Sequence, residues 1–133
     1  MPLNVAQTVL LAIYLAFVIV EAAAQTYPAK PIRIIVGAGS GGGVDTISRL
    51  VGQQFDQSWR QQVVVENKPG AGGAVASDQV AKSPPDGYTL LTMSISYAVI
   101  PASHKNLGYD PIRDFTPVAV LVNNAVWARF QPL

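Results

Sequence analysis

The most constraining feature of this chain is an alternation of short β-branched runs with glycine-rich turns. Residues 32–36 (IRIIV) and 63–65 (VVV) are typical of short buried strands, because β-branched side chains favour extended backbone. Residues 37–43 (GAGSGGG) and 68–73 (KPGAGG) follow these runs directly. So much glycine disfavours the interior of a helix or strand. The pattern therefore predicts a strand, a glycine turn and then a new element, twice in succession.

Each glycine turn is followed by a segment with helical character. The first helix is predicted to begin at Asp45, whose carboxylate is a good N-cap. Its apolar residues recur at steps of three and four, which predicts one apolar stripe facing the core; they are Ile47, Leu50, Val51, Phe55 and Trp59. A shorter helix is expected over residues 74–82.

The second half of the chain continues the alternation. A third strand is expected over residues 88–93, a helix over 96–103, and further strands over 118–122 and 125–130. Repeated strand, turn and helix predict an α/β fold with a parallel sheet and helical crossovers. In such a sheet every loop that follows a strand emerges at the carboxyl edge, where open α/β folds bind ligands.

Three loops should therefore lie side by side at this edge, over residues 37–45, 68–73 and 94–96. Glycine-rich turns before helix N-termini leave backbone N–H groups unpaired, with the helix dipole behind them. We predict a site for a small anion that is held mainly by main-chain donors. Additional hydroxyl donors would come from Ser40, Ser94 and Ser96. The alternative is that these glycines serve only tight turns and close packing.

The first turn also fits a second class of protein. Residues 37–42 satisfy G-x-G-x-x-G, and Glu66 ends the next strand, which is the outline of a dinucleotide-binding fingerprint. Gly43 and Val44 are expected to prolong the loop, so that the helix starts later than this fingerprint requires. A truncated Rossmann domain of an oxidoreductase is therefore the alternative. A helix that begins about three residues before Asp45 would favour it.

Composition excludes several other functions. The net charge is +1, which gives no indication of a nucleic-acid partner, and the chain has no cysteine to form a disulfide or act as a nucleophile. The single histidine, His104, follows Ser103 without a G-x-S-x-G elbow, and no ligand pair has metal-binding spacing. We expect no catalytic residue, no metal ion and no cofactor.

The N-terminus resembles an export signal. Residues 9–20 form an uncharged apolar run that is too short for the roughly 20 residues of a membrane-spanning helix. The run is followed by Glu21 and then Ala22-Ala23-Ala24, which predicts cleavage after Ala24 and a periplasmic location. Residues 2–8 carry no Lys or Arg, and a buried core helix or an uncleaved anchor are the alternatives.

Several segments, in order and at this spacing, closely resemble one family. They are YPAKPIR at 27–33, GGGVD at 41–45, VVVENKPGAGG at 63–73, AKSPPDGYTLL at 81–91, KNLGYD at 105–110 and FTPV at 115–118. Together they resemble the substrate-binding receptors of tripartite tricarboxylate transporters, the Bug family. The resemblance extends over residues 26–122.

The resemblance implies a two-lobed periplasmic binding-protein fold of type II, which closes over its ligand. Such receptors are not enzymes; they bind small organic carboxylates, largely through backbone amides, and deliver them to a membrane permease. By position, the resemblance implies these ligand-binding residues: Gly41, Gly42, Gly43, Asp45, Gly70, Ala71, Gly72, Gly73 and Ser94.

The chain departs from the family in two ways. Residues 37–40 lack the family's Pro/Phe-containing approach to the triple glycine, and the family's receptors are more than twice as long. The expected organisation is a signal peptide over 1–24, the first lobe over 25–122, and the truncated start of an interlobe crossover over 123–133. A non-functional fragment, from a frameshifted gene or a partial gene model, is a further alternative.

Overall fold

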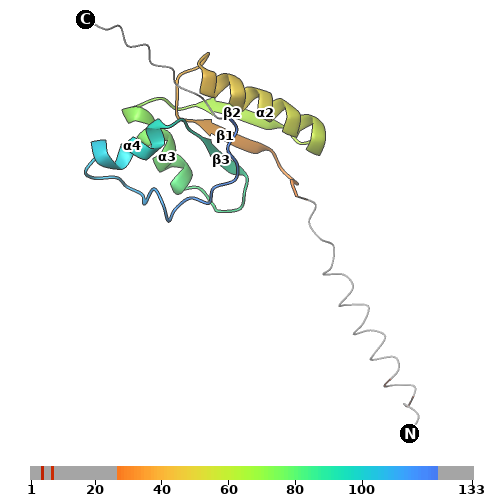
Figure 1. Cartoon of the computed structure of the whole chain (residues 1–133). Helices are drawn as coiled ribbons and strands as arrows, with labels where there is room; N and C mark the ends of the chain where they lie inside the picture. The colour runs from red at the N-terminus through yellow and green to blue at the C-terminus, as the bar shows by residue number, and fades with distance from the viewer. Residues whose placement is uncertain (1–3, 5–6, 8–26, 123–133) are drawn as a thin grey trace, which may run out of the picture.

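A computed structural model describes residues 4, 7 and 27–122 of the chain. The expected signal peptide and the expected strand over residues 125–130 lie outside these, apart from Asn4 and Gln7. The elements, in chain order, are β1 (Ile32–Val36), α2 (Gly43–Trp59), β2 (Val63–Asn67), the 3-10 helix η1 (Ala71–Gly73), α3 (Ala74–Ala81), β3 (Thr89–Thr92) and α4 (Ser96–Ser103) (Figure 1).

The three strands form one parallel sheet in the order β2-β1-β3. Residues Ile32 to Val36 of β1 pair with Val63 to Asn67 of β2, and Val36 also pairs with Thr92 of β3. The predicted parallel sheet with helical crossovers is confirmed. Because the chain passes from β2 across to the far side of β1, the carboxyl ends of β1 and β3 border a topological switch point.

The core is centred on β1. Ile32, Ile35 and Val36 have no exposed surface, and Ile34 is 2% exposed. Helix α2 contacts β2 and β1, whereas α3 contacts β3 and β1, so the central strand is covered by helices from both crossovers (Figure 1). Four of the five residues of β1 are β-branched and buried, as expected of a central strand covered on both faces, and only Arg33 is exposed.

Helix α2 begins earlier than the sequence predicts, and a different face is buried. Its N-cap is Gly42, so the prediction of Asp45 as N-cap is wrong. The buried residues are Asp45, Ser48 and Gly52. A methyl group at Gly52 would lie 3.3 Å from Cγ2 of Val65, so the helix lies very close to the sheet along this small-residue line.

Because α2 lies so close to the sheet, large residues of the predicted apolar stripe lie at the edge of the interface between helix and sheet. Leu50 is 53% exposed and Trp59 is 38% exposed. Trp59 instead stacks on Phe55, with ring centroids 4.2 Å apart, and meets Tyr27 edge-on. The prediction of a core-facing stripe was therefore wrong for Leu50 and Trp59, because the sheet accepts only small side chains at this distance. The other stripe residues, Ile47, Val51 and Phe55, are half-buried.

The predicted strand over residues 118–122 is also wrong. The segment has no strand assignment, and the sheet of the described chain has three strands. Val118 is 81% exposed and Val120 is 86% exposed. Its apolar, β-branched composition favours extended backbone, but a strand also needs a neighbour to accept and donate its backbone hydrogen bonds.

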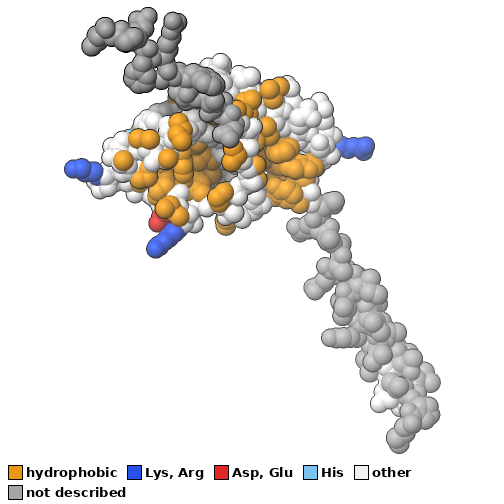
Figure 2. Space-filling model, viewed as in Figure 1, with side chains coloured by type: hydrophobic (Ala, Val, Ile, Leu, Met, Phe, Trp, Pro, Cys, Tyr) orange, Lys and Arg blue, Asp and Glu red, His pale blue; other side chains and the backbone are white. Residues whose placement is uncertain are grey.

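Apolar side chains are spread over the face of the molecule seen in Figure 2. Large apolar residues with at least half of their surface exposed include Ile95, Val99, Ile112, Val118 and Val120. Among the described residues, no helix combines the length and the apolar character that crossing a membrane requires.

Candidate functional site

The two glycine loops touch each other at the carboxyl edge of the sheet. A methyl group added at Gly37 would lie 3.4 Å from Cα of Gly73, and one added at Gly73 would lie 3.3 Å from the carbonyl oxygen of Gly37. Met93, which precedes Ser94 in the third loop, contacts both glycines. The prediction that the three loops lie side by side is confirmed.

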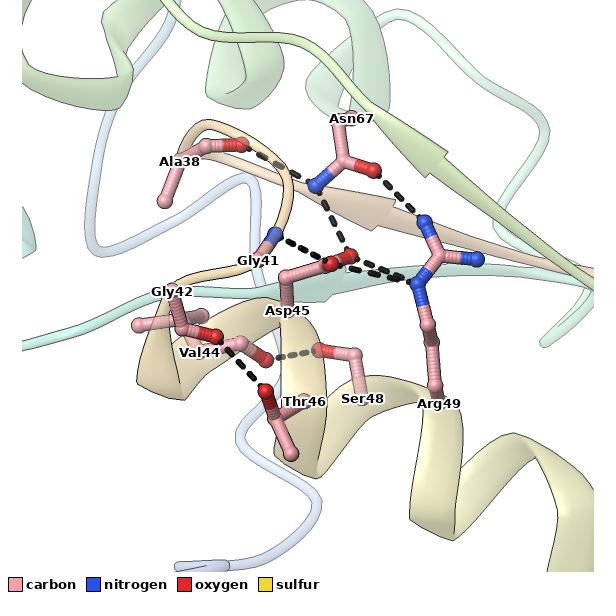
Figure 3. Close-up of polar contacts among 9 residues, drawn as sticks. All are labelled: Ala38, Gly41, Gly42, Val44, Asp45, Thr46, Ser48, Arg49 and Asn67. Atoms are coloured by element: carbon pink, nitrogen blue, oxygen red, sulfur yellow. Dashed lines mark hydrogen bonds and ion pairs between the residues drawn. The ribbon is translucent and has the colours of Figure 1, made fainter.

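The first loop presents the N-terminus of α2. The Gly42 N-cap has no side chain to cap the helix, and its carbonyl accepts the Thr46 N–H at 2.9 Å and the Thr46 hydroxyl at 3.1 Å (Figure 3). Earlier N–H groups of a helix have no acceptor within it. Gly42 and Gly43 are exposed and lie at the N-terminus of α2, which is the positive end of the helix dipole.

Asp45 is buried beneath this loop and is 3% exposed. Its Oδ2 accepts the Gly41 N–H at 2.8 Å, and its Oδ1 accepts an N–H of the Asn67 side chain at 2.9 Å (Figure 3). The Arg49 Nε lies 3.0 Å from Oδ1. The Asp45 carboxylate therefore holds the first loop against the start of α2, and both of its oxygens accept hydrogen bonds from protein donors.

These donors also set the charge of Asp45. The Arg49 hydrogen bond, the Gly41 N–H and the Asn67 amide lower the pKa of Asp45 from its ordinary 3.8 to about 2. Asp45 is thus ionised at neutral pH, and the Arg49 guanidinium beside it offsets its charge. Since Gly41 gives its N–H to Asp45, the adjacent free donors of this loop are those of Gly42 and Gly43.

Asn67 ties the first loop to the end of β2. Its side-chain nitrogen also donates to the Ala38 carbonyl at 3.1 Å, and its oxygen accepts from Nη2 of Arg49 at 2.9 Å (Figure 3). Sequence reasoning missed both Asn67 and Arg49. Two signals were present: Arg49 follows Asp45 by one helical turn, and Asn67 ends the strand beside β1.

The second loop has an unusual backbone. Gly70, Ala71, Gly72 and Gly73 have φ values of 140°, 47°, 65° and 102°, so four successive residues are in conformations that favour glycine. The Gly73 N–H is used within the loop, because it donates to the Gly70 carbonyl at 2.8 Å. Gly70, Ala71 and Gly72 are exposed, whereas Gly73 is buried.

The third loop places Ser94 at the start of α4. Its Oγ lies 2.9 Å from Oγ of Ser96, and the Ser96 N–H donates to it at 3.4 Å. Ser94 is exposed. The expected contacts thus form two groups: Asp45 and Gly73 are buried supports, and the other residues expected to bind ligand lie at the surface.

The serine and histidine that were considered for catalysis, Ser103 and His104, lie at the C-terminal end of α4. Ser103 Oγ is 3.0 Å from Nδ1 of His104 and is also within hydrogen-bonding distance of the Val99 and Ile100 carbonyls. No cluster of three or more metal-ligating side chains occurs in the described part of the chain.

Comparison with known proteins identifies the family. The model of the tripartite tricarboxylate transporter family receptor matches residues 47–128. The chain belongs to this family. This confirms the resemblance, and it supports the receptor interpretation against the dehydrogenase interpretation.

Proteins with similar sequences come from several bacteria. The chain is 44% identical over 121 residues to a UPF0065 protein of Bordetella bronchiseptica, and the match covers 90% of this chain and 36% of that protein. It is 41% identical over 100 residues to BugT of Bordetella pertussis, covering 74% and 31%. The chain thus spans about a third of the length of these relatives.

Solved structures of the family share the fold. The periplasmic binding protein BugD is 38% identical with a TM-score of 0.64, over 68% of this chain and 30% of that one. MatC of Rhodopseudomonas palustris with bound malate is 36% identical with a TM-score of 0.60, over 71% and 33%. A third protein, from R. palustris with adipate, is 30% identical with a TM-score of 0.58, over 64% and 29%.

The start of α2 at Gly43, two residues before Asp45, is closer to what the dinucleotide-binding alternative predicted than to what the receptor interpretation predicted. The receptor interpretation expected Gly43 and Val44 to lie in the loop, but both belong to the first turn of α2. This expectation was wrong, because the exposed Gly42 serves as N-cap and Asp45 reaches back from within the helix. The match to the receptor family decides between the receptor and the dinucleotide-binding interpretations.

Proposed function

We propose that this chain supplies one wall of a binding site for small organic carboxylates in the periplasm. The observation that carries the proposal is the contact between the loop at 37–43 and the loop at 70–73, at the switch point of the sheet. Both loops expose backbone next to a helix start, and neither contains a Lys or Arg. Such an arrangement favours an anion held by main-chain N–H groups.

The family relatives suggest the class of ligand. Two of the similar receptors contain malate and adipate, which are both dicarboxylates. Gly42 and Gly43 would donate to a carboxylate from the first loop, and Ala71 and Gly72 from the second, with Ser94 as a hydroxyl donor. Asp45 would act beneath them, because its carboxylate keeps the first loop in place.

The proposal includes export and transport. Residues 1–24 would act as the cleaved signal, residues 25–122 would form the first lobe, and the loaded receptor would deliver its ligand to a membrane permease. The support is family membership together with the periplasmic location of similar proteins of known structure.

We expect this wall alone to bind weakly. A solvent-exposed hydrogen bond contributes only about 0.5–1.5 kcal/mol net, because the ligand exchanges it with water. Binding-protein sites gain affinity when a second wall encloses the ligand and excludes solvent. Dissociation constants in the millimolar range are therefore expected for the chain by itself.

Amide chemical shifts measured by NMR test the proposal. The isotope-labelled chain is titrated with malate and with adipate, and with an uncharged diol at matched ionic strength as control. We expect saturable shifts at Gly42, Gly43, Ala71 and Gly72 with either dicarboxylate, and none with the diol. Absence of saturable shifts, or shifts confined to other elements, would show that the loops are not a carboxylate site.

A further inference from the structure

We propose that Met93 is a positioning residue, which fixes the separation of the two glycine loops and thereby the length of carboxylate that the site prefers. The inference rests on the proposed carboxylate site and adds a determinant of its specificity. Met93 follows β3 directly and is partly buried. It is not among the residues that the family resemblance marks as ligand contacts.

The side chain of Met93 lies between Gly37 of the first loop and Gly73 of the second. A methyl group at Gly37 would overlap Sδ of Met93 and lie 3.2 Å from its Cε. A methyl group at Gly73 would overlap Cε of Met93 and lie 2.9 Å from Sδ. The thioether therefore fills a slot that exists because both positions lack a Cβ.

This slot lies at the functionally important point of the sheet. The Gly37 N–H donates to the Thr92 carbonyl at 3.2 Å, so the first loop leaves β1 beside the end of β3. The carboxyl ends of β1 and β3 border the switch point, where open α/β sheets bind ligands. Met93 thus lies directly beside the two loops that carry the backbone donors.

The two glycines have different requirements. Gly73 has a φ of 102°, which a side chain would strain whatever its neighbours. Gly37 has no such backbone requirement, and the atoms that a methyl group there would overlap belong to Met93. The need for glycine at position 37 therefore follows from the presence of the Met93 side chain.

The packing explains how one side chain controls the site. Asp45 and Asn67 attach the first loop to β2, and their side-chain hydrogen bonds go to the first loop, to Arg49 and to each other. Met93 contacts both loops. If its thioether is removed, the loops can close the gap, because packed segments relax partly into a cavity. If the backbone N–H groups of the two loops lie closer together, the site favours a shorter dicarboxylate.

The test compares dissociation constants for malate and adipate, measured by the same amide titration. We expect Met93→Ala to change the ratio of the two constants in favour of the shorter malate, by about threefold to tenfold, which corresponds to one hydrogen bond. Met93→Leu, with similar volume, should keep the ratio of the wild-type chain. Leu50→Ala, which truncates an exposed apolar residue of α2, is the matched control and should also keep it.

A second pair of variants tests the slot itself. Gly37→Ala should weaken binding of both dicarboxylates, because the new methyl group displaces the thioether. Adding Met93→Ala to Gly37→Ala should recover affinity, because the methyl group then occupies the space left by the thioether. Such compensation between the two positions is the signature of direct contact. It also keeps the inference testable if Met93→Ala alone fails to fold.

The outcomes are distinguishable. If the wild-type chain binds both dicarboxylates but Met93→Ala keeps the wild-type ratio, Met93 has no positioning role, even if thermal stability falls. Additive losses in the double variant would also overturn the inference. If the wild-type chain binds neither dicarboxylate, the proposed function fails and the role of Met93 fails with it.

Discussion

Asp45 accepts the backbone N–H of Gly41 at 2.8 Å, across the turn that opens α2. The side chain reaches back from the first helical turn to a donor before the N-cap, in the manner of the acidic residue of a capping box. The turn is thereby closed by the protein's own carboxylate. The N–H groups of Gly42 and Gly43 remain available at the positive end of the helix.

The first prediction concerns this closure. Asp45→Asn removes the charge that Arg49 faces, and it places an amide group against the donors from Gly41 and Asn67. We expect a lower melting temperature, together with broadened amide signals for Gly41, Gly42 and Gly43. Asp56→Asn, at an exposed position of the same helix, is the control and should leave both unchanged.

The second prediction is a pH dependence with a defined sign. The pKa of Asp45 is lowered to about 2 from its ordinary 3.8, so the folded state binds this proton less tightly than the unfolded state does. Its contribution to stability is complete above about pH 4 and is lost as the pH falls towards 2. Denaturant melts of the wild-type chain and Asp45→Asn should therefore converge over this interval.

The comparison with Asp45→Asn is needed because other carboxyl groups titrate in the same direction. Hydrogen bonding to Arg33 lowers the pKa of Glu66, and hydrogen bonding to Lys30 lowers that of Asp86. Both groups are present in each protein, so their effects cancel in the difference. A constant difference between the two proteins from pH 5 to pH 2 would contradict the assignment.

The third prediction isolates a single donor. Gly43 is the first residue of α2, where proline is well accepted, and Gly42 before it has an extended backbone (φ −82°, ψ 171°) that suits a residue preceding proline. Gly43→Pro therefore deletes one N–H without breaking the helix. We expect carboxylate binding to weaken by about threefold to tenfold, the value of one hydrogen bond.

The matched control for this deletion is Gly43→Ala. A Cβ at position 43 would meet no atom within 4 Å, so alanine keeps the N–H and adds no clash. Isothermal titration or NMR should show wild-type affinity for this variant. Equal losses in the proline and alanine variants would indicate that the Gly43 N–H does not bind the carboxylate.

The sequence was sufficient to predict the sheet and the location of the loops. The β-branched run at Ile32–Val36 became the buried central strand, and α4 occupies the expected Ser96–Ser103. Both predictions depend on local composition. The proximity of the glycine loops followed from parallel topology, which needs no knowledge of individual side-chain contacts.

Contacts between distant side chains could not be predicted in this way. Asn67 and Met93 are ordinary residues at the ends of strands, and their roles depend on which atoms face them after folding. The burial of Ser48 and Gly52 instead of Leu50 followed from the short distance between helix and sheet. Periodicity reports which residues are apolar, but it does not report that distance.

The fourth prediction uses the backbone of the second loop. Ala71 has a φ of 47°, a conformation that costs a residue with a Cβ about 1–2 kcal/mol. Ala71→Gly removes this cost but makes the unfolded chain more flexible, which costs about 0.5–1 kcal/mol. We expect a net stabilisation of up to about 1.5 kcal/mol in urea melts, and weaker carboxylate binding, because the loop becomes less rigid.

Arg60 offers the matched control for Ala71. It has a φ of 53° at the C-terminal end of α2, outside the glycine loops. Arg60→Gly should give a similar gain in stability with no change in carboxylate affinity. If both variants alter binding equally, the rigidity of the second loop has no specific role.

The fifth prediction concerns the exposed run at residues 118–122 (VAVLV), which carries no charge. Uncharged β-prone segments of this length promote edge-to-edge association. Val120 is 86% exposed, so Val120→Lys should change the free energy of unfolding by no more than about 0.5 kcal/mol. Size-exclusion chromatography should show less self-association for this variant than for the wild-type chain at the same concentration.

Ile100 provides the contrast, because it is 1% exposed in α4. Ile100→Ala should cost about 2–5 kcal/mol of stability through lost burial and a residual cavity. It should increase self-association, because partly unfolded chains expose more apolar surface. If Val120→Lys were instead as destabilising as Ile100→Ala, residues 118–122 would be packed against a neighbouring segment in solution. That outcome would contradict the exposure of Val120.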